Sequence, residues 1–348
     1  MPKVQNQISG NISKLALFLK KIKQFSSMIR LSHTLFALPF ALTALVIIVK
    51  NSLTEFSWAN LVFVVLAFTG ARSFSMGINR IADAKIDADN PRTKNREIPA
   101  GILSISQVWI FTVISMLLTT LFAWLLTPLA FYLSFPAMIL LAGYSYSKRF
   151  TWLCHLWLGA VIGMAPLGVY IALTQTLPTT SWILFGILTT YIGGFDILYS
   201  LQDIDFDRKQ RLYSIPARFG VNLSLLISTA LHLLSIAGFF WLGFYEALGV
   251  IYTIGAVILS ILVIMEHKII GWSNHVKLDK IPVAFFNYNS AISILFFLFI
   301  LAGSFYKVPF FKDNAFMGNK PLSLKLLSVQ KIDASMSGAG SQVRAESR

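Results

Sequence analysis

The 348-residue chain is 56% hydrophobic and only 13% charged, with a mean hydropathy of +0.69. Soluble globular domains carry about a quarter charged residues, so this composition excludes an ordinary soluble domain and indicates a membrane protein. The formal net charge is +14, but the basic residues lie in loops beside long apolar runs, which indicates membrane topology rather than a nucleic-acid partner.

The N-terminal residues 1–24 are basic and lack an apolar core followed by a small-residue cleavage site, so we expect a cytosolic lead-in rather than a cleaved signal peptide. Residues 25–306 form the predicted transmembrane domain. Its apolar runs have about the 20 residues that a spanning helix needs, and in lipid such runs favour helices because the backbone must satisfy its own hydrogen bonds. Nine spans are predicted, at 32–50, 57–79, 103–126, 129–146, 155–174, 180–201, 222–243, 246–266 and 284–306.

Basic residues mark one end of these spans. The lead-in, the loop at 92–96, the pair Lys148–Arg149 and the segments 208–218 and 268–280 all fall on one side of a nine-span protein. We expect this side to face the cytoplasm of a bacterial inner membrane. Residues 307–348 carry seven Lys and Arg against three acids on the opposite side. They are predicted to form a tail that is partly amphipathic and disordered at its end.

Eight of the fifteen acidic residues gather in two windows. Within each window three residues are spaced by four, a step that keeps them on one face of a helix. Both trios lie at the C-terminal end of a predicted helix, where the helix dipole disfavours carboxylates and like charges four residues apart repel. A bound divalent cation would offset both unfavourable interactions. The trios are Asn79, Asp83 and Asp87, and Tyr199, Asp203 and Asp207. Asp89 and Asp205 lie on the opposite helical face and are weaker candidates.

The two windows correspond to each other across 120 residues, since Asp83 matches Asp203 and Asp87 matches Asp207. Each window ends the second helix of a four-helix set. We therefore predict an all-α fold of two duplicated four-helix halves and a ninth helix around a central cavity. Carboxylate oxygens select hard cations, and Mg²⁺ binds through one or two carboxylates plus substrate phosphates. The pattern predicts a magnesium-bridged diphosphate, with contacts to its oxygens from the interleaved basic residues, which include Arg92, Lys94, Arg96 and Lys209.

Two charged residues are placed within the spans and on the stripes that end in the trios. Arg72 lies seven residues before Asn79, and Asp196 lies seven residues before Asp203. A charged residue inside a membrane span is costly and therefore indicates a functional site. Arg72 is suited to anchor a carboxylate of a second substrate. Arg30 and His33, at the start of the first span, are within reach of the cavity mouth.

These motifs resemble those of the UbiA-type intramembrane aromatic prenyltransferases over roughly residues 25–305. The segment NRIADAKIDADNPRTKNREIPAG is similar to the family's first Asp-rich motif, and DILYSLQDIDFDRKQRLYSIPARFG is similar to its second. Arg80 stands where many members have Asp, a departure that also occurs in the menaquinone-linked branch. The resemblance implies Mg²⁺, a polyprenyl diphosphate and an aromatic acceptor. It is strongest to the branch that acts on 4-hydroxybenzoate for ubiquinone and to the branch that acts on a dihydroxynaphthoate for menaquinone.

The resemblance also implies the residues' roles. Asp83, Asp87, Asp203 and Asp207 would hold the metal, and Arg92, Lys94, Arg96 and Lys209 would hold the diphosphate. The allylic C–O bond would ionise in an apolar cavity where Tyr199 faces the cation. Asp196 is the candidate to remove the ring proton. A secondary transporter is a competing interpretation, but the carboxylates cluster at the membrane edge rather than its midplane. A third interpretation is a lipid-linked alcohol phosphotransferase, but the Asp-Gly start and the Ala-Arg pair that precede the aspartates in that family are absent here.

Overall fold

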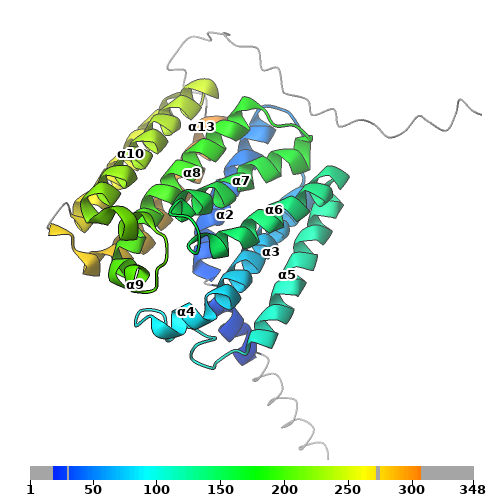
Figure 1. Ribbon diagram of the computed structural model, residues 1–348. Coiled ribbons are helices and arrows are strands. Elements are labelled where there is room, and N and C mark those ends of the chain that lie inside the picture. Colours follow the sequence, from blue (N-terminus) through cyan, green and yellow to red (C-terminus); the bar gives the residue numbers. More distant parts are fainter. Residues whose placement is uncertain (1–18, 30, 272–274, 307–348) are drawn as a thin grey trace, which may run out of the picture.

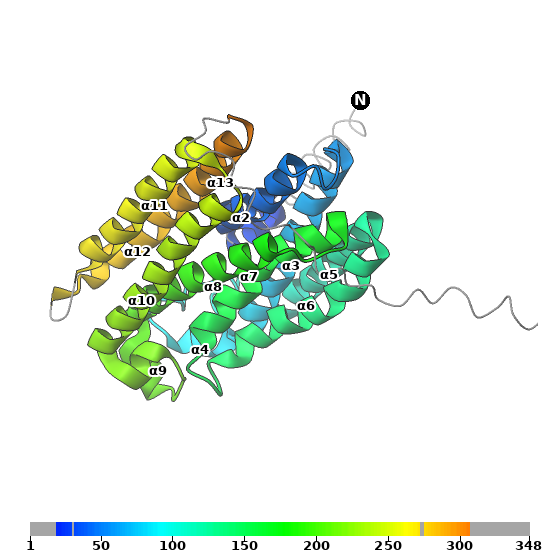
Figure 2. The same ribbon diagram turned by 90° about the horizontal axis from the view of Figure 1, so that it is seen from above.

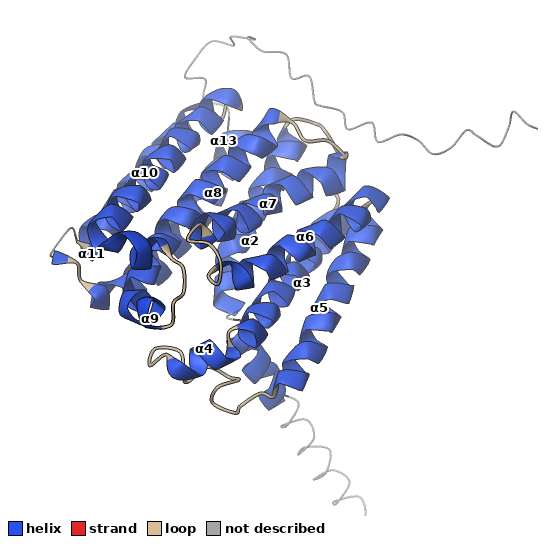
Figure 3. Cartoon of the chain, viewed as in Figure 1, coloured by secondary structure: helices blue, strands red, loops and turns tan. Residues whose placement is uncertain are grey.

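The computed structural model describes residues 19–29, 31–271 and 275–306, except the side chains of residues 31–37, 283 and 285. All elements in these ranges are helical, as Figure 3 shows. Most of the predicted lead-in, Arg30, the side chain of His33 and the predicted C-terminal tail lie outside this description.

Within the described ranges nine long helices form a bundle, which Figures 1 and 2 show from two directions. Eight of the described helical segments are long and apolar enough to cross a membrane, and together they indicate an integral membrane protein. In the first predicted span the apolar helix that can be assessed, Leu38–Lys50, is shorter than a membrane span requires. The predicted number of nine spans is therefore not confirmed. The long helices are α2 (Leu31–Lys50), α3 (Trp58–Ala82), α5 (Ile105–Leu126), α6 (Pro128–Ser147), α7 (Cys154–Thr174), α8 (Thr179–Ser200), α10 (Ile215–Tyr245), α11 (Gly249–Ile270) and α13 (Asn289–Phe305).

Short polar residues begin several of these helices. Ser57, Ser104 and Ser214 each accept a hydrogen bond from the backbone N–H three residues later, and Thr127 does the same before Pro128. Such caps satisfy backbone donors that have no partner within the helix. Large apolar side chains remain exposed on the outer faces, for example Ile139 at 72% and Leu117 at 56%. In a membrane these faces contact lipid, which satisfies apolar side chains without burial in protein.

Glycines bring two pairs of helices into close contact. On α3, an added Cβ at Gly77 would lie 2.1 Å from Thr112 Oγ1 of α5. On α7, an added Cβ at Gly159 would lie 2.3 Å from the backbone oxygen of Thr189 in α8. Only glycine permits such approaches. They hold α3 against α5 and α7 against α8, and a cavity remains between the two pairs, beside α6.

A buried polar cluster joins three helices at the end of the bundle away from the Asp-rich segments. Glu246, just after α10, is 4% exposed. It accepts hydrogen bonds from Thr180 in α8 and from Asn51 after α2, the latter at 2.8 Å, and it lies 3.3 Å from Lys50 Nζ. A buried carboxylate needs such partners, so the cluster fixes the relative positions of α2, α8 and α10.

Both Asp-rich segments are broken at their central aspartate. The long helix α3 ends before Asp83 (φ −94°, ψ 4°), and the short helix α4 (Ala84–Asp89) begins after it. In the second half Asp203 (φ −109°, ψ 7°) is the last residue of the 3₁₀ turn Leu201–Asp203 and directly precedes α9 (Ile204–Lys209). The continuous helices implied by the four-residue spacing are therefore wrong. The same break recurs 120 residues apart, and α4 and α9 lie at the same end of the bundle (Figure 1).

Candidate active site

In the first Asp-rich segment Asp83 and Asp87 each have a basic partner. Arg96 Nη1 lies 2.7 Å from both carboxylate oxygens of the buried Asp87. Asp83 accepts a hydrogen bond of 3.0 Å from Asn79 Nδ2, and its other oxygen lies 3.7 Å from Arg149 Nη2. Guanidinium groups, one from this segment and one from the loop after α6, therefore offset the charge of these carboxylates, and the same groups bind phosphate oxygens.

In the second segment Asp203 is bound by residues of the first. Arg92 Nε and Nη2 lie 2.9 and 2.5 Å from the two carboxylate oxygens of Asp203, and Asn90 Nδ2 donates to it at 3.2 Å. The guanidinium of Arg92 also lies over the ring of Tyr199, 5.1 Å from its centroid, and donates to its hydroxyl at 2.9 Å. This two-pronged ion pair joins the two halves of the protein directly.

The second aspartate of that segment is bound from two sides. Ser214 donates to Asp207 at 2.8 Å, and Lys148 Nζ, just after α6, lies 3.8 Å from the same oxygen. Lys148 therefore belongs to the N-terminal half but pairs with the C-terminal one. The two Asp-rich segments thus converge. Each of the four predicted metal ligands has a basic partner: Arg149, Arg96, Arg92 and Lys148 for Asp83, Asp87, Asp203 and Asp207.

The surroundings of this cluster favour the protonated, charged forms of Lys148 and Arg92. They disfavour the ionised form of the Asp83 carboxyl group. Burial and the neighbouring charge of Asp87 raise the pKa of Asp83 to about 6. Burial opposes the charged form of Lys148, but nearby carboxylates, Asp207 foremost, outweigh it and raise its pKa above the usual range. Burial likewise opposes the charge on Arg92, and its hydrogen bonds to Asp203 raise its pKa. A positive ligand near Asp83 would favour its charged form.

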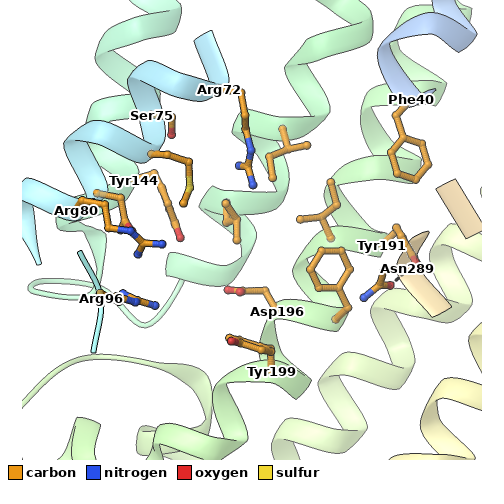
Figure 4. Close-up of a pocket in the computed structure, with 16 residues that line it drawn as sticks. Phe40, Arg72, Ser75, Arg80, Arg96, Tyr144, Tyr191, Asp196, Tyr199 and Asn289 are labelled. Carbon is orange, nitrogen blue, oxygen red and sulfur yellow. Dashed lines mark hydrogen bonds between the residues drawn. The ribbon is translucent and has the colours of Figure 1, made fainter. Parts of the chain in front are cut away.

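A cavity of about 190 Å³, here called the reaction pocket, lies between the aspartates and the interior. Its wall contains the polar residues Arg72, Tyr144, Asp196 and Tyr199, which point into one space in Figure 4. Apolar residues such as Phe195 complete it. The Nε groups of Arg72 and of Arg96, which also lines the pocket, are buried without a hydrogen-bond partner. Buried guanidinium groups with unused donors suit an anionic ligand.

Asp196 is held by a histidine behind it. His155 Nδ1 lies 2.7 Å from Asp196 Oδ2, and His155 is fully buried at the start of α7. The carboxylate therefore has one oxygen engaged with α7, while its residue lines the reaction pocket.

The remaining predicted site residues differ in where the structure places them. Asn79 and Tyr199 line the reaction pocket. Lys94 and Lys209 are exposed, and in the described part of the chain no ion pair joins either of them to an aspartate. Asp89 and Asp205 are also exposed. The roles predicted for Lys94 and Lys209 therefore gain no support from contacts in the structure.

Sequence reasoning missed three contributors to the site. The sequence pattern places Lys148 and Arg149 only among the basic residues that mark membrane sidedness, and it does not single out His155. Their positions contained a signal, because Lys148 and Arg149 end a span, and His155 begins one, on the side where the aspartates lie. The pairings join residues 41 to 66 positions apart, from His155 with Asp196 to Arg149 with Asp83, and have no periodic signature.

The donor set is compatible with Mg²⁺. Within the described ranges no three His, Cys, Asp or Glu side chains are grouped closely enough to form a cation site by themselves. The available donors are hard carboxylate and amide oxygens, and unused Arg N–H groups lie beside them. This fits an ion that takes part of its coordination from phosphate and water rather than from an all-protein cage.

Comparison with known proteins identifies relatives of the chain. The UbiA prenyltransferase family matches residues 37–290. The 4-hydroxybenzoate octaprenyltransferase of Vibrio parahaemolyticus is 30% identical over 234 residues, which cover 67% of this chain and 81% of that protein. The protein of the same name from Tolumonas auensis is 32% identical over 234 residues, covering 66% and 79%.

Two solved structures have a similar fold. The apo structure of a UbiA homolog from Aeropyrum pernix K1 is 29% identical with a TM-score of 0.70, covering 78% of this chain and 97% of that one. A UbiA homolog from Archaeoglobus fulgidus bound to GPP and Mg²⁺ is 19% identical with a TM-score of 0.61, covering 80% and 99%.

Proposed function

The chain belongs to the UbiA prenyltransferase family, and we propose that it transfers a polyprenyl group from a polyprenyl diphosphate to a ring carbon of a small aromatic acid. The observation that supports this most directly is the convergence of two Asp-rich segments beside a pocket that contains Arg72 and Asp196, with the four predicted metal ligands each paired with a base. The relatives named 4-hydroxybenzoate octaprenyltransferase favour a hydroxybenzoate as the acceptor.

The donor's diphosphate is proposed to bind at the charged end. Asp83, Asp87, Asp203 and Asp207 would hold Mg²⁺, which when bound supplies positive charge against the leaving diphosphate. Arg92, Arg96, Lys148 and Arg149 would exchange their carboxylate partners for diphosphate oxygens. The GPP and Mg²⁺ named for the Archaeoglobus homolog belong to the same ligand classes.

The aromatic acceptor is proposed to bind in the reaction pocket. Arg72, whose Nε lacks a partner, would anchor its carboxylate. The C1–O bond of the donor breaks and its electron pair leaves on the diphosphate. The allylic cation that results is shielded from water and faces Tyr199. A ring carbon of the acceptor forms the new C–C bond, and Asp196 takes the displaced ring proton.

The setting of this reaction is proposed from the sequence pattern. Residues 25–306 form the catalytic domain in a bacterial inner membrane, with the aspartates facing the cytoplasm. The diphosphate of the donor and the carboxylate of the acceptor would then reach the site from the cytoplasm. Membrane lipid would surround the exposed apolar faces of the helices.

A direct test uses membranes that contain the protein, Mg²⁺ and a labelled prenyl diphosphate, with hydroxybenzoate and a dihydroxynaphthoate offered in parallel and products identified by mass. We expect a prenylated hydroxybenzoate. A prenylated dihydroxynaphthoate instead would retain the chemistry and assign the acceptor of menaquinone biosynthesis. Absence of any covalent product, with uptake of an organic anion into proteoliposomes, would replace the enzyme with a transporter.

A further inference from the structure

The reaction pocket has a further polar wall, at the start of α13, that the proposed function does not use. Asn289 lines the pocket and is 7% exposed. The hydroxyl of Tyr191, which also lines the pocket, donates a hydrogen bond to Asn289 Oδ1 (Figure 4). Asn289 Nδ2 is buried and has no hydrogen-bond partner. The amide therefore presents an unused NH₂ group, and this group can only donate.

Tyr191 is a fixed partner for the oxygen of this amide. Its side chain is 1% exposed, and its ring packs against the rings of Phe40 and Phe195, with centroids 6.1 and 5.5 Å apart. The backbone oxygen of Tyr191 can only accept, so it receives its 3.1 Å hydrogen bond from His232 Nε2. With both its ring and its backbone held, Tyr191 keeps the Asn289 amide in one place.

A neighbouring carboxyl group does not use up the amide. Glu266 of α11 lies beside Asn289, but no hydrogen bond joins Asn289 Nδ2 to it, and Glu266 Oε2 is likewise buried without a partner. An amide NH₂ carries two hydrogens, so even a closer approach to Glu266 would leave one for a ligand. Polar groups inside membrane spans are costly, and their presence here indicates a functional role for this wall.

The backbone before Asn289 is irregular. Residues Ala284–Tyr288 form a π-helical turn that directly precedes α13. Such turns widen a helix and are frequent at functional sites. Asn287 lies within the turn and is exposed, whereas Asn289 is buried and lines the reaction pocket. The chain thus places two asparagines close together, and Asn287 is a natural control for Asn289.

We infer that Asn289 Nδ2 donates a hydrogen bond to the ring hydroxyl of a phenolic acid whose carboxylate is held by Arg72. The inference rests on the proposed function, because it needs the aromatic acceptor in the reaction pocket. Arg72 comes from α3 and Asn289 from α13, and Figure 4 shows their polar groups on different sides of the pocket. Two donors placed in this way select a hydroxyl across the ring from the carboxylate rather than one beside it.

This contact orients the acceptor rather than accelerating bond formation. Electron density leaves the hydroxyl oxygen as the neighbouring ring carbon attacks the allylic cation, so a donor on that oxygen gives the transition state no extra stabilisation. The contact acts on affinity and on which ring carbon faces C1 of the donor. An acceptor without the hydroxyl leaves the buried NH₂ group unpaired, and sites built on hydrogen bonds reject analogues for this reason.

The test is a double-mutant cycle between the amide and the hydroxyl, measured without a prenyl donor. Equilibrium dialysis against the full chain in detergent gives dissociation constants for 4-hydroxybenzoate, benzoate and 2-hydroxybenzoate. The unmodified protein should bind 4-hydroxybenzoate about tenfold more tightly than the other two. Asn289→Leu should abolish this preference and leave the affinity for benzoate within about twofold. Asn287→Leu should retain the preference.

Asn289→Ala removes the same donor without adding bulk, and it should behave as Asn289→Leu does. A preference for 4-hydroxybenzoate that survives in both variants would overturn the inference, as would an unmodified protein that binds benzoate equally well. Loss of benzoate binding in both variants would also overturn it, because Asn289 would then support the fold beside Glu266 rather than the hydroxyl.

Failure of the proposed function has a different signature. If the three ligands behave as expected but membranes with Mg²⁺ and a prenyl diphosphate form no prenylated hydroxybenzoate, the pocket binds a phenolic acid and the proposed reaction fails. If prenylated hydroxybenzoate forms and the Asn289 variants keep the preference, the reaction stands and the role of Asn289 fails.

Discussion

His155 Nδ1 lies 2.7 Å from Asp196 Oδ2, while the backbone N–H of Ile215 donates to His155 Nε2 at 3.4 Å. Because Nε2 accepts, the hydrogen of the neutral ring is on Nδ1 and is donated to Asp196. The histidine therefore fixes one oxygen of the carboxylate and leaves the other for the reaction pocket.

His155→Phe should lower kcat by about 10–100-fold, the usual effect of losing a partner that orients a functional group. KM for the prenyl diphosphate should change little, because the diphosphate binds elsewhere. His155→Asn places an amide donor near the position of Nδ1 and should recover much of the rate. Steady-state kinetics on both variants test this. Equal losses in both would mean that His155 only fills space.

Arg92→Lys should raise KM for the prenyl diphosphate about tenfold or more, because lysine cannot give the diphosphate oxygens the paired contacts that the guanidinium of Arg92 would give on leaving Asp203, and hydrogen bonds to charged groups are worth about 1.5–3 kcal/mol. Lys268→Gln removes a positive charge from an exposed residue of α11 at the same end of the bundle. If it raised KM as much, the effect would be general electrostatics. Lys94→Gln separately tests the role predicted for Lys94.

Asp83→Ala and Asp203→Ala should each reduce the rate by about 100-fold or more, as the removal of a preorganised charged contact does. They occupy equivalent breaks in the two halves, so the losses should be similar. Chelation by EDTA should abolish activity of the unmodified protein, and added Mg²⁺ should restore it. Product formation at the unmodified rate by either variant would refute the proposed metal site.

Glu246→Ala should destabilise the protein by about 3 kcal/mol, because it leaves buried partners of a carboxylate unpaired. The exposed Glu55, in the loop before α3, provides the control, and Glu55→Ala should have little effect. Thermal unfolding in detergent measures both. Similar midpoints for the two variants would show that the Glu246 cluster does not fix the helices.

The sequence predicted the main elements because they depend on local pattern. Apolar runs located the long helices, and the 120-residue correspondence located both Asp-rich segments at one end of the fold. The sequence pattern did not predict features that depend on packing between helices. The breaks at Asp83 and Asp203 interrupt helices that the four-residue spacing implied. Contacts such as Lys148 with Asp207 form between helices, and no spacing along one helix reveals them.

The one-to-one pairing of four aspartates with four bases bears on how ligands arrive. Before either ligand binds, these eight charges offset one another, so by themselves they attract neither a lone cation nor a lone anion over a long distance. A cation that engages the aspartates frees their bases for an anion, and an anion frees the aspartates in turn. Each ligand must then tighten the other's affinity by the same factor, and the protein selects the two as an ion pair.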